Sequence, residues 1–461
     1  MVAKALDLHI QDLQLECWNN CQPGTQFQGQ GSSHELASLL LTECIQYSLH
    51  SIKEPVFVLY LDAQAAFDVV QRKLLIRNLF HSQCPDQSLV YQDIRLAARQ
   101  TIVDWNGNLM GPIEDGQGLE QGGINSSDLY KIYGREQLTM TQSSGLGIYL
   151  GGLHVASIGQ ADDTVLVSND INKLYYLLEL SNTACRKNMI DIGAEKTRLQ
   201  AYAKRGFALN TNVETPIFIN EQNIPFSDLA EHVGVIRSTS GNGPAIMARI
   251  SAHRKALASV LHTGIARSHR GNPASSIKIE KLYATPVLLS GISSLVLSSN
   301  EVKLIDIHYA ETLRCLLRLH KKTPRCVTFF LAGSLPGTAL IHLRQLSIFG
   351  MICRLQDNIL HKHAIKIFSA RTYSPKSWFY QIRSCCVQYG LPHPADLLSS
   401  PPSKSSYKLL IKKKIISYWE SFLRAEAAEL HSLSFFNPYY MSLVHPHPAI
   451  ASAGTSPAKV A

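Results

Sequence analysis

Three aspartates stand at the ends of apolar runs in the sequence. Asp62 is the first charged residue after the apolar run Val56–Leu61, and Asp162 and Asp163 form a tandem pair in SIGQADDTVLVS (157–168). Because the run before Asp62 is apolar without alternation, it predicts a strand that is covered on both faces and carries a carboxylate at its tip. Carboxylate oxygens on a rigid frame are the ligands that hard divalent cations prefer. The pattern therefore predicts a metal site built on buried strands.

The order of these aspartates indicates phosphoryl transfer. Two divalent cations about 3.5–4 Å apart catalyse that reaction, because one activates the attacking hydroxyl and the other neutralises the leaving oxygen. The tandem pair would repel itself at a turn unless a cation neutralised it. One Asp at a strand end or turn is usually an ordinary cap or turn residue, but the combination is typical of a metal-dependent nucleic-acid polymerase. Mg²⁺ or Mn²⁺ is the expected cofactor.

The periodicity of the sequence predicts the elements that position the aspartates. Leu153–Val155 and Thr164–Val167 predict two short strands, with the turn at Gly159–Asp163 between them. Residues 35–52 predict an amphipathic helix. After the joint STSGNG (238–243), apolar residues recur at helical spacing with Arg and Lys between them. We therefore expect an α+β first part followed by a helical second part.

Four blocks of the sequence resemble, in the same order, the reverse transcriptases of non-LTR (LINE-type) retrotransposons. They are FQGQGSSHELASLLLTECIQ (27–46), LDAQAAFDVV (61–70), GLEQGGINSSDLYKIY (118–133) and GQADDTVLVS (159–168). The similarity extends from about Gln26 to at least Leu319. It implies an RNA-directed DNA polymerase, a nucleotidyltransferase that extends a DNA primer on an RNA template with deoxynucleoside triphosphates.

The resemblance also implies roles for single residues. Asp62, Asp162 and Asp163 would be the catalytic carboxylates and the metal ligands, with Asp62 and Asp162 as the direct ligands. Because the metal polarises the primer hydroxyl, no histidine base is required. Lys196 would face the phosphates, although a lysine at a strand end is also commonly just exposed. The segment EHVGVI (231–236) resembles the beginning of the primer grip.

Phe67 and the Gln-Gly loop are the substrate-binding residues that the resemblance implies. Phe67 matches the aromatic residue beneath the incoming sugar, where it would exclude a 2′-hydroxyl. From the residues alone, Phe67 also fits a helix core, in an apolar stripe with Val70, Leu74 and Leu75. Gln121 and Gly122 would lie against the template base and the nascent pair. Without the resemblance, a glycine-rich loop before a helix is only a turn.

Several positions depart from the family pattern. Gln160 stands where an aromatic residue usually precedes Ala-Asp-Asp, and residues 124–127 lack the usual proline. Only Lys4 and Lys53 supply positive charge before Asp62, although a triphosphate needs basic donors. The chain therefore resembles an amino-terminally truncated element product. The alternatives are a domesticated or decaying palm and thumb that only binds nucleic acid, or an RNA-templated RNA polymerase or intron maturase, against which Phe67 argues.

The charge of the chain is distributed unevenly. Of the 461 residues, 45% are hydrophobic and 17% charged, as in a globular protein of two or three domains. Residues 1–238 contain 17 Lys and Arg against 26 Asp and Glu, whereas residues 239–461 contain 27 against 9. The net charge is thus −9 in the first part and +18 in the second. A basic half of this kind favours binding to a phosphate backbone.

These observations predict an α+β polymerase right hand with four parts. Partial fingers and palm, an antiparallel sheet with helices, would occupy residues 1–238, and a helical basic thumb residues 239–330. A mostly helical carboxyl-terminal region would follow at 331–440, and a disordered low-complexity tail at 441–461. Within the third part, KLLIKKKIISYWESFL (408–423) predicts a basic amphipathic helix that either binds RNA or covers the core.

The remaining composition predicts few further partners. Ten cysteines without a secretory signal indicate reduced thiols, and hence a nuclear or cytoplasmic protein. Cys315, His320 and Cys326 lack the paired spacing of a zinc site. The apolar stretch from Pro286 to Leu297 is too short to span a bilayer, so no membrane partner is expected. The sequence does not indicate the oligomeric state.

Overall fold

The chain forms two compact units. The computed structural model describes residues 25–27, 33–97, 100–114, 116–204, 216–260, 272–370, 376–433 and 441–451. The first unit comprises residues 1–233 with 357–359, and the second comprises residues 234–356 with 360–461.

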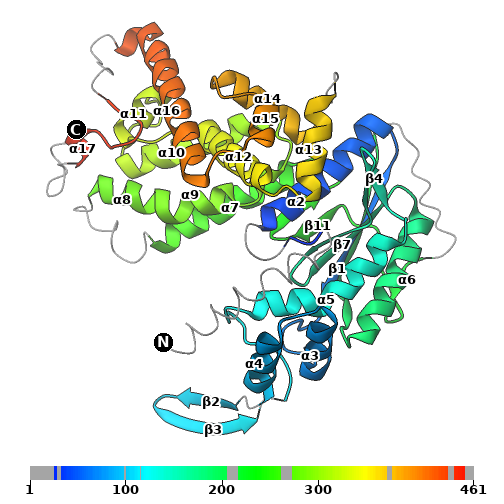
Figure 1. The fold of residues 1–461 in the computed structure, drawn as a ribbon. Coiled ribbons are helices and arrows are strands. Elements are labelled where there is room, and N and C mark those ends of the chain that lie inside the picture. The colour runs from blue at the N-terminus through cyan, green and yellow to red at the C-terminus, as the bar shows by residue number, and fades with distance from the viewer. Residues whose placement is uncertain are drawn as a thin grey trace. The chain divides into compact units, whose positions relative to one another are not determined.

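The first unit is built on a four-stranded antiparallel sheet (Figure 1). Its strands are β6 (Ser157–Gln160), β7 (Asp163–Ser168), β1 (Val56–Ala63) and β8 (Ile192–Tyr202), in that spatial order. The central strand β1 is buried from Val56 to Leu61, as its unbroken apolar run predicted. A strand covered on both faces is therefore the scaffold that carries Asp62.

Helices cover one face of this sheet. They are α5 (Ser126–Ser143) and α6 (Ile171–Lys187), which pack against each other, together with α3 (Arg72–His81) and α4 (Asp86–Ala97). Phe57, Leu59 and Leu61 alternate along β1 and point into the same core as Leu129 of α5 and Leu177 of α6. This side of the sheet is thus a closed apolar core, and Val56, Val58 and Tyr60, which point to the other side, are buried as well.

Smaller elements complete the first unit. Helix α2 (His34–Tyr47) continues into the π-helical turn η1 (Ser48–Ile52), so the expected helix is present, but α2 is buried on nearly all sides rather than on one face. The strands are β2 (Gln100–Trp105) with β3 (Asn108–Glu114), β4 (Ile148–Leu150) with β5 (Leu153–Val155), β9 (Phe218–Ile219) with β10 (Gln222–Asn223), and β11 (Leu229–His232).

Two expected elements differ in the structure. The hairpin that carries the tandem aspartates uses Ser157–Gln160 as its first strand, not Leu153–Val155. The reason is local, because Gly151 and Gly152 both adopt positive φ and form a separate two-residue turn that pairs β5 with β4. Phe67 lies in a turn and not on a helix, since α3 begins only at Arg72.

The second unit is almost entirely helical (Figure 1). After β12 (Val235–Ser238) it contains α7 (Gly243–Val260), α8 (Pro273–Ile279), η3 (Glu280–Ala284), α9 (Thr285–Leu289), η4 (Ile292–Ser294), α10 (Ser299–Leu317), α11 (Arg325–Ala332), α12 (Gly337–Arg354), α13 (Ile359–Ser369), α14 (Trp378–Gln388), α15 (Pro394–Ser399), α16 (Lys404–Glu429), η5 (His431–Leu433) and α17 (Pro448–Ala451). Helix α12 packs against both α10 and α16. The fold class is therefore the expected one: an antiparallel palm sheet with helices, followed by a helical thumb and a mostly α carboxyl-terminal region.

The structure does not separate residues 239–330 from residues 331–440, because both belong to the second unit. Residues 441–451, which the sequence assigned to a disordered tail, include α17, and Leu443 and Ile450 are buried. Residues 452–461 of that expected tail lie outside the described residues. Within the described part, no single helix is long and apolar enough to cross a membrane, and only the bent pair α11 and α12, at 61°, reaches that length and apolarity together.

A buried polar network joins four elements of the second unit. The Nδ1 of His253 on α7 lies 3.0 Å from the Nε2 of His308 on α10, and its Nε2 lies 3.3 Å from the Oε1 of Glu280 in η3. Glu280 also accepts hydrogen bonds from the hydroxyl groups of Thr285 and Tyr309. Because buried polar groups are costly unless paired, this network favours one arrangement of these elements.

We expect the second unit to lose stability in acid through His308. Burial, followed by repulsion from His253 and Arg254, lowers the pKa of His308 from 6.5 to about 4. The unfolded chain then binds the proton more readily, so this contribution to stability is full above pH 6.5 and is lost as pH falls toward 4. Between pH 7 and 4.5 the loss should be roughly 2–3 kcal/mol in the free energy of unfolding, measured with urea. In His308→Gln this loss should disappear; a difference from wild type that does not vary with pH would contradict the assignment.

Candidate metal and nucleotide site

The palm sheet brings the three aspartates to one of its ends. Asp62 lies near the end of β1 and pairs with Gly193 of β8. Gln160 pairs with Asp163, so Ala161 and Asp162 form a two-residue turn and Asp163 begins β7. Because the antiparallel register joins Leu61 to Thr164, Asp62 and Asp163 come next to each other at adjacent positions of neighbouring strands. Residues a hundred positions apart in the sequence are thereby brought together.

Negative charge accumulates at this end of the sheet. Loss of hydration, followed by repulsion from Asp162, Asp62 and Glu231, raises the pKa of Asp163 from 3.8 to about 6, against the opposing hydrogen bond from the backbone N–H of Val233. The Asp163 side chain is nevertheless exposed on the surface, so we attribute the perturbation mainly to the neighbouring carboxylates. Glu231 of β11 was not recognised as part of this site in the sequence.

Lys196 is the cation that the structure places beside Asp62. Its Nζ lies 3.7 Å from the Oδ1 of Asp62, and its side chain is 78% exposed. An exposed ion pair of this length contributes little to stability, so the lysine is free to exchange its partner. The structure thus links two of the residues predicted from the sequence, whereas the expected contact of Lys196 with phosphates stays a prediction.

Gly193 leaves room for Asp62 and was missed in the sequence. A Cβ atom at Gly193 would lie 3.0 Å from the Cγ of Gln64 and 3.4 Å from the Oδ2 of Asp62. A glycine inside a strand often marks such a close approach. The glycine in DIGAEKT (191–197) was therefore an available signal, but it points to a neighbour only once the strand pairing is known.

The turn that carries Asp162 is held from two sides. Ala161 adopts φ of +55°, which is unfavourable for a residue with a side chain. Gly159 lies so close to helix α5 that a Cβ atom would come within 2.5 Å of Leu138. On the other side, the N–H of Phe27 donates to the carbonyl of Gly159 at 2.8 Å, and the N–H of Gly159 donates to the carbonyl of Thr25 at 3.1 Å. These contacts support a turn that the local sequence does not favour.

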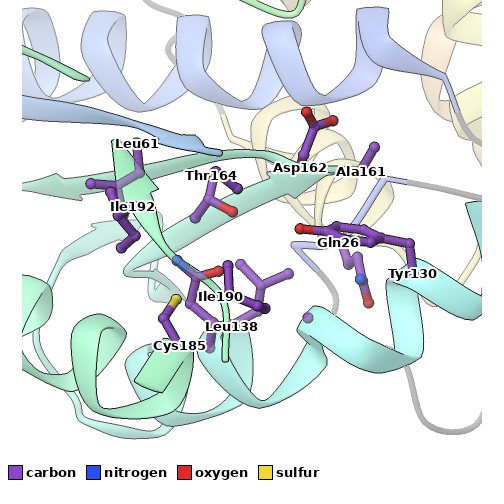
Figure 2. A pocket seen from close by; sticks show the side chains of 13 residues that line it. Gln26, Leu61, Tyr130, Leu138, Ala161, Asp162, Thr164, Cys185, Ile190 and Ile192 are labelled. Atoms are coloured by element: carbon purple, nitrogen blue, oxygen red, sulfur yellow. The ribbon is translucent and has the colours of Figure 1, made fainter. Parts of the chain in front are cut away.

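A cavity lies beneath this turn, between the sheet and the helices (Figure 2). Asp162 and Ala161 border it, and Asp162 points away from the wall formed by Leu138 and Cys185. Tyr130 of α5 also borders the cavity. Burial, followed by the charge of Asp162, raises the pKa of Tyr130, so its hydroxyl stays protonated.

Phe67 contacts the same helix. Its ring stacks on Tyr130 with centroids 4.9 Å apart and an interplanar angle of 28°. The side chain is only partly buried, so one part of the ring packs on the core and another part reaches the surface. The packing agrees with a core residue, whereas the expected contact of Phe67 with a sugar stays a prediction.

The Gln-Gly loop is tied to the segment that carries Phe67. The N–H of Leu119 donates to the carbonyl of Phe67, and the N–H of Gly118 donates to the carbonyl of Val70, both at 2.8 Å. The Arg72 side chain donates to the carbonyl groups of Gln117 and Gly118. Gln121 and Gly122 follow in an exposed turn before α5, so the loop and Phe67 form one connected wall.

The donors at the site fit a divalent metal in chemistry but are not gathered around one point. Carboxylate oxygens suit Mg²⁺ and Mn²⁺, and a cation would relieve the repulsion that raises the pKa of Asp163. Among the described residues, however, no group of three or more His, Cys, Asp or Glu side chains is arranged to hold a metal ion.

A protein-family model matches most of the first unit. Residues 1–222 match the family model described as "Reverse transcriptase (RNA-dependent DNA polymerase)". This part of the chain is therefore similar to a reverse transcriptase domain.

Curated proteins and solved structures add little to this match. No curated protein matches the chain. Among solved structures, the chain is similar to the telomerase of Candida albicans, solved in complex with a fragment of telomeric RNA, at 11% identity and a TM-score of 0.36. The similar region covers 69% of this chain and 55% of that one.

We expect Asp163→Asn to stabilise the metal-free protein at neutral pH. Because the folded pKa of about 6 lies above the ordinary 3.8, ionised Asp163 opposes folding, and stability falls as pH rises from 4 through 6. The variant should therefore melt at a higher temperature than wild type at pH 7.5 in EDTA, and this gain should vanish near pH 4. Asp93→Asn, an exposed change on α4, serves as the control. An equal change in melting temperature at both pH values would contradict the assignment of charge repulsion to Asp163.

Proposed function

We propose that the chain is the reverse transcriptase of a non-LTR retrotransposon and transfers deoxynucleotides to the 3′-hydroxyl of a primer on an RNA template. The observation that supports this proposal most is the meeting of Asp62, Asp162 and Asp163 at one end of an antiparallel palm sheet. This meeting occurs inside the region that matches the reverse transcriptase model. Template, primer and nucleotide partners follow from that activity.

In this proposal the three aspartates hold Mg²⁺ or Mn²⁺, which supplies positive charge for the hydroxyl and the triphosphate when bound. Asp163 gives up the proton that mutual repulsion lets it retain below pH 6. Lys196, which is exposed and weakly paired, leaves Asp62 and turns its ammonium group toward the phosphates. In each change a metal ion or a phosphate replaces a proton or an ion-pair partner. Before metal and nucleotide bind, the proton on Asp163 and the ammonium group of Lys196 therefore compensate part of the negative charge of the aspartates.

Phe67, Gln121 and Gly122 would form the nucleotide-binding wall. The stacking of Phe67 on Tyr130 fixes the ring, and a fixed ring excludes a 2′-hydroxyl better than a mobile one. Gly122 adopts φ of +82°, which lets the backbone of the loop approach a base pair without a side chain between them.

A second candidate is a palm and thumb that binds nucleic acid without polymerising. Two observations favour it. Among the described residues, no three His, Cys, Asp or Glu side chains are arranged to hold one metal ion. Lys53 is also the sole Lys or Arg that the described segments contain before Asp62. A triphosphate would then meet few basic donors.

Primer extension separates the two candidates. The full chain should extend a DNA primer on an RNA template with deoxynucleotides and Mg²⁺ or Mn²⁺, and Asp162→Asn should lower the rate by at least about 100-fold, because it removes charge at the reacting centre. Asp93→Asn should leave the rate unchanged. If wild type and Asp162→Asn bind primer-template equally and neither extends it, the binding-only candidate is supported instead.

Phe67 should control the choice of sugar. Phe67→Val should raise the incorporation of ribonucleotides relative to deoxynucleotides by roughly 10-fold or more, since a steric contact of this size is worth about 1–3 kcal/mol. Phe67→Tyr keeps the ring and should preserve the preference. The ratio of kcat/KM for the two nucleotides is the measurement. An unchanged ratio in Phe67→Val would leave Phe67 with only its packing role.

A further inference from the structure

Helix α16 of the second unit carries an exposed run of positive charge. It contains five lysines in its first eleven residues, all exposed, and its first acidic residue is Glu420. The lysines are Lys404, Lys408, Lys412, Lys413 and Lys414. We call this surface the α16 lysine face.

One side of the helix is fixed by packing. Tyr407, Ile411 and Ile415 are buried, with exposed fractions of 2% or less. Tyr407 packs closely over Gly350 of α12, where a Cβ atom would come within 2.4 Å of its ring. Because the apolar side of α16 is occupied by its own unit, the helix presents its lysines and not its apolar side to a partner.

The α16 lysine face is not compensated inside the protein. Lys404, Lys408 and Lys412 are spaced by four residues and lie one above the other, an arrangement in which like charges destabilise a helix. Within the described part of the chain, none of the five lysines forms an ion pair. Lys412 also lies near the partly buried Lys281. Burial lowers the pKa of Lys281 most, the charge of Glu280 opposes this effect, and the charge of Lys412 lowers the pKa further. An external anion would relieve this repulsion.

The geometry of α16 favours an extended polyanion over a lipid surface. A helix binds to a membrane by inserting its apolar side, and that side of α16 is already buried. Lys404, Lys408 and Lys412 extend over about 12 Å along the helix axis, and a nucleic-acid strand offers several phosphates over such a length. Leu409, which is 70% exposed between two of the lysines, offers an apolar contact to a sugar or a base.

We propose that the α16 lysine face binds the sugar-phosphate backbone of a nucleic acid through residues that do not belong to the candidate polymerase centre. The shared ligand chemistry is a row of phosphates, from either RNA or DNA. This site needs no metal and no catalysis, so it stands even if the chain does not polymerise.

The experiment measures binding of the full chain to a fluorescent single-stranded RNA between 50 and 200 mM salt. A triple variant, Lys408→Gln, Lys412→Gln and Lys413→Gln, is compared with a matched variant, Lys173→Gln, Lys303→Gln and Lys362→Gln, which removes three exposed lysines elsewhere. We expect the α16 variant to bind several-fold more weakly and to lose roughly 2 from the slope of log K against log salt, about 0.7 for each phosphate contact. The matched variant should keep the wild-type slope.

Further arms distinguish phosphate binding at α16 from misfolding and from a general loss of positive charge. Lys→Arg changes at the same three positions should restore binding, because they preserve the charge, and equal melting temperatures confirm that the variants fold. The assay measures binding and no extension, so a failed polymerase test leaves this result intact. Repeating the titration with single-stranded DNA shows which backbone is preferred. Equal losses in both triple variants, or loss of binding only to anionic phosphatidylserine vesicles, would overturn the proposal.

Discussion

The pairing of β1 with β7 and β8 is the interaction on which the first unit depends. Phe57, Leu59 and Leu61 of β1 pack into the core that α5 and α6 share, so a shift of register by one residue would move all three to the opposite face of the sheet. The same register joins Leu61 to Thr164 and thereby sets Asp62 beside the tandem aspartates. The packing of the core therefore also determines which carboxylates lie together at the end of the sheet.

That arrangement holds carboxylates together against their mutual repulsion. The raised pKa of Asp163 and the exposed ion pair of Lys196 with Asp62 are two responses to the same excess of negative charge. In the second unit the excess is positive, and the lysines of α16 are left without partners among the described residues. The two parts of the chain therefore carry an excess of charge of opposite sign.

Several features were readable from the sequence because their causes are local. The unbroken apolar run before Asp62 predicted a buried strand, and the position of Asp162 and Asp163 at a hairpin was apparent from their apolar flanks. The strands of that hairpin were assigned wrongly, since Gly151 and Gly152 form a turn of their own. Phe67 was assigned to a helix that begins only at Arg72, because helical spacing persists by chance over a few residues.

The sequence by itself determined which carboxylates are available, which strand is buried and how charge divides between the two parts of the chain. Only the tertiary structure decided that Glu231 adds to the repulsion, that Gly193 makes room for Asp62, that Phe67 stacks on Tyr130, and which side of α16 stays exposed. The physical reason is that periodicity and composition act over neighbouring residues, whereas these contacts join segments whose proximity is set by packing across the whole unit.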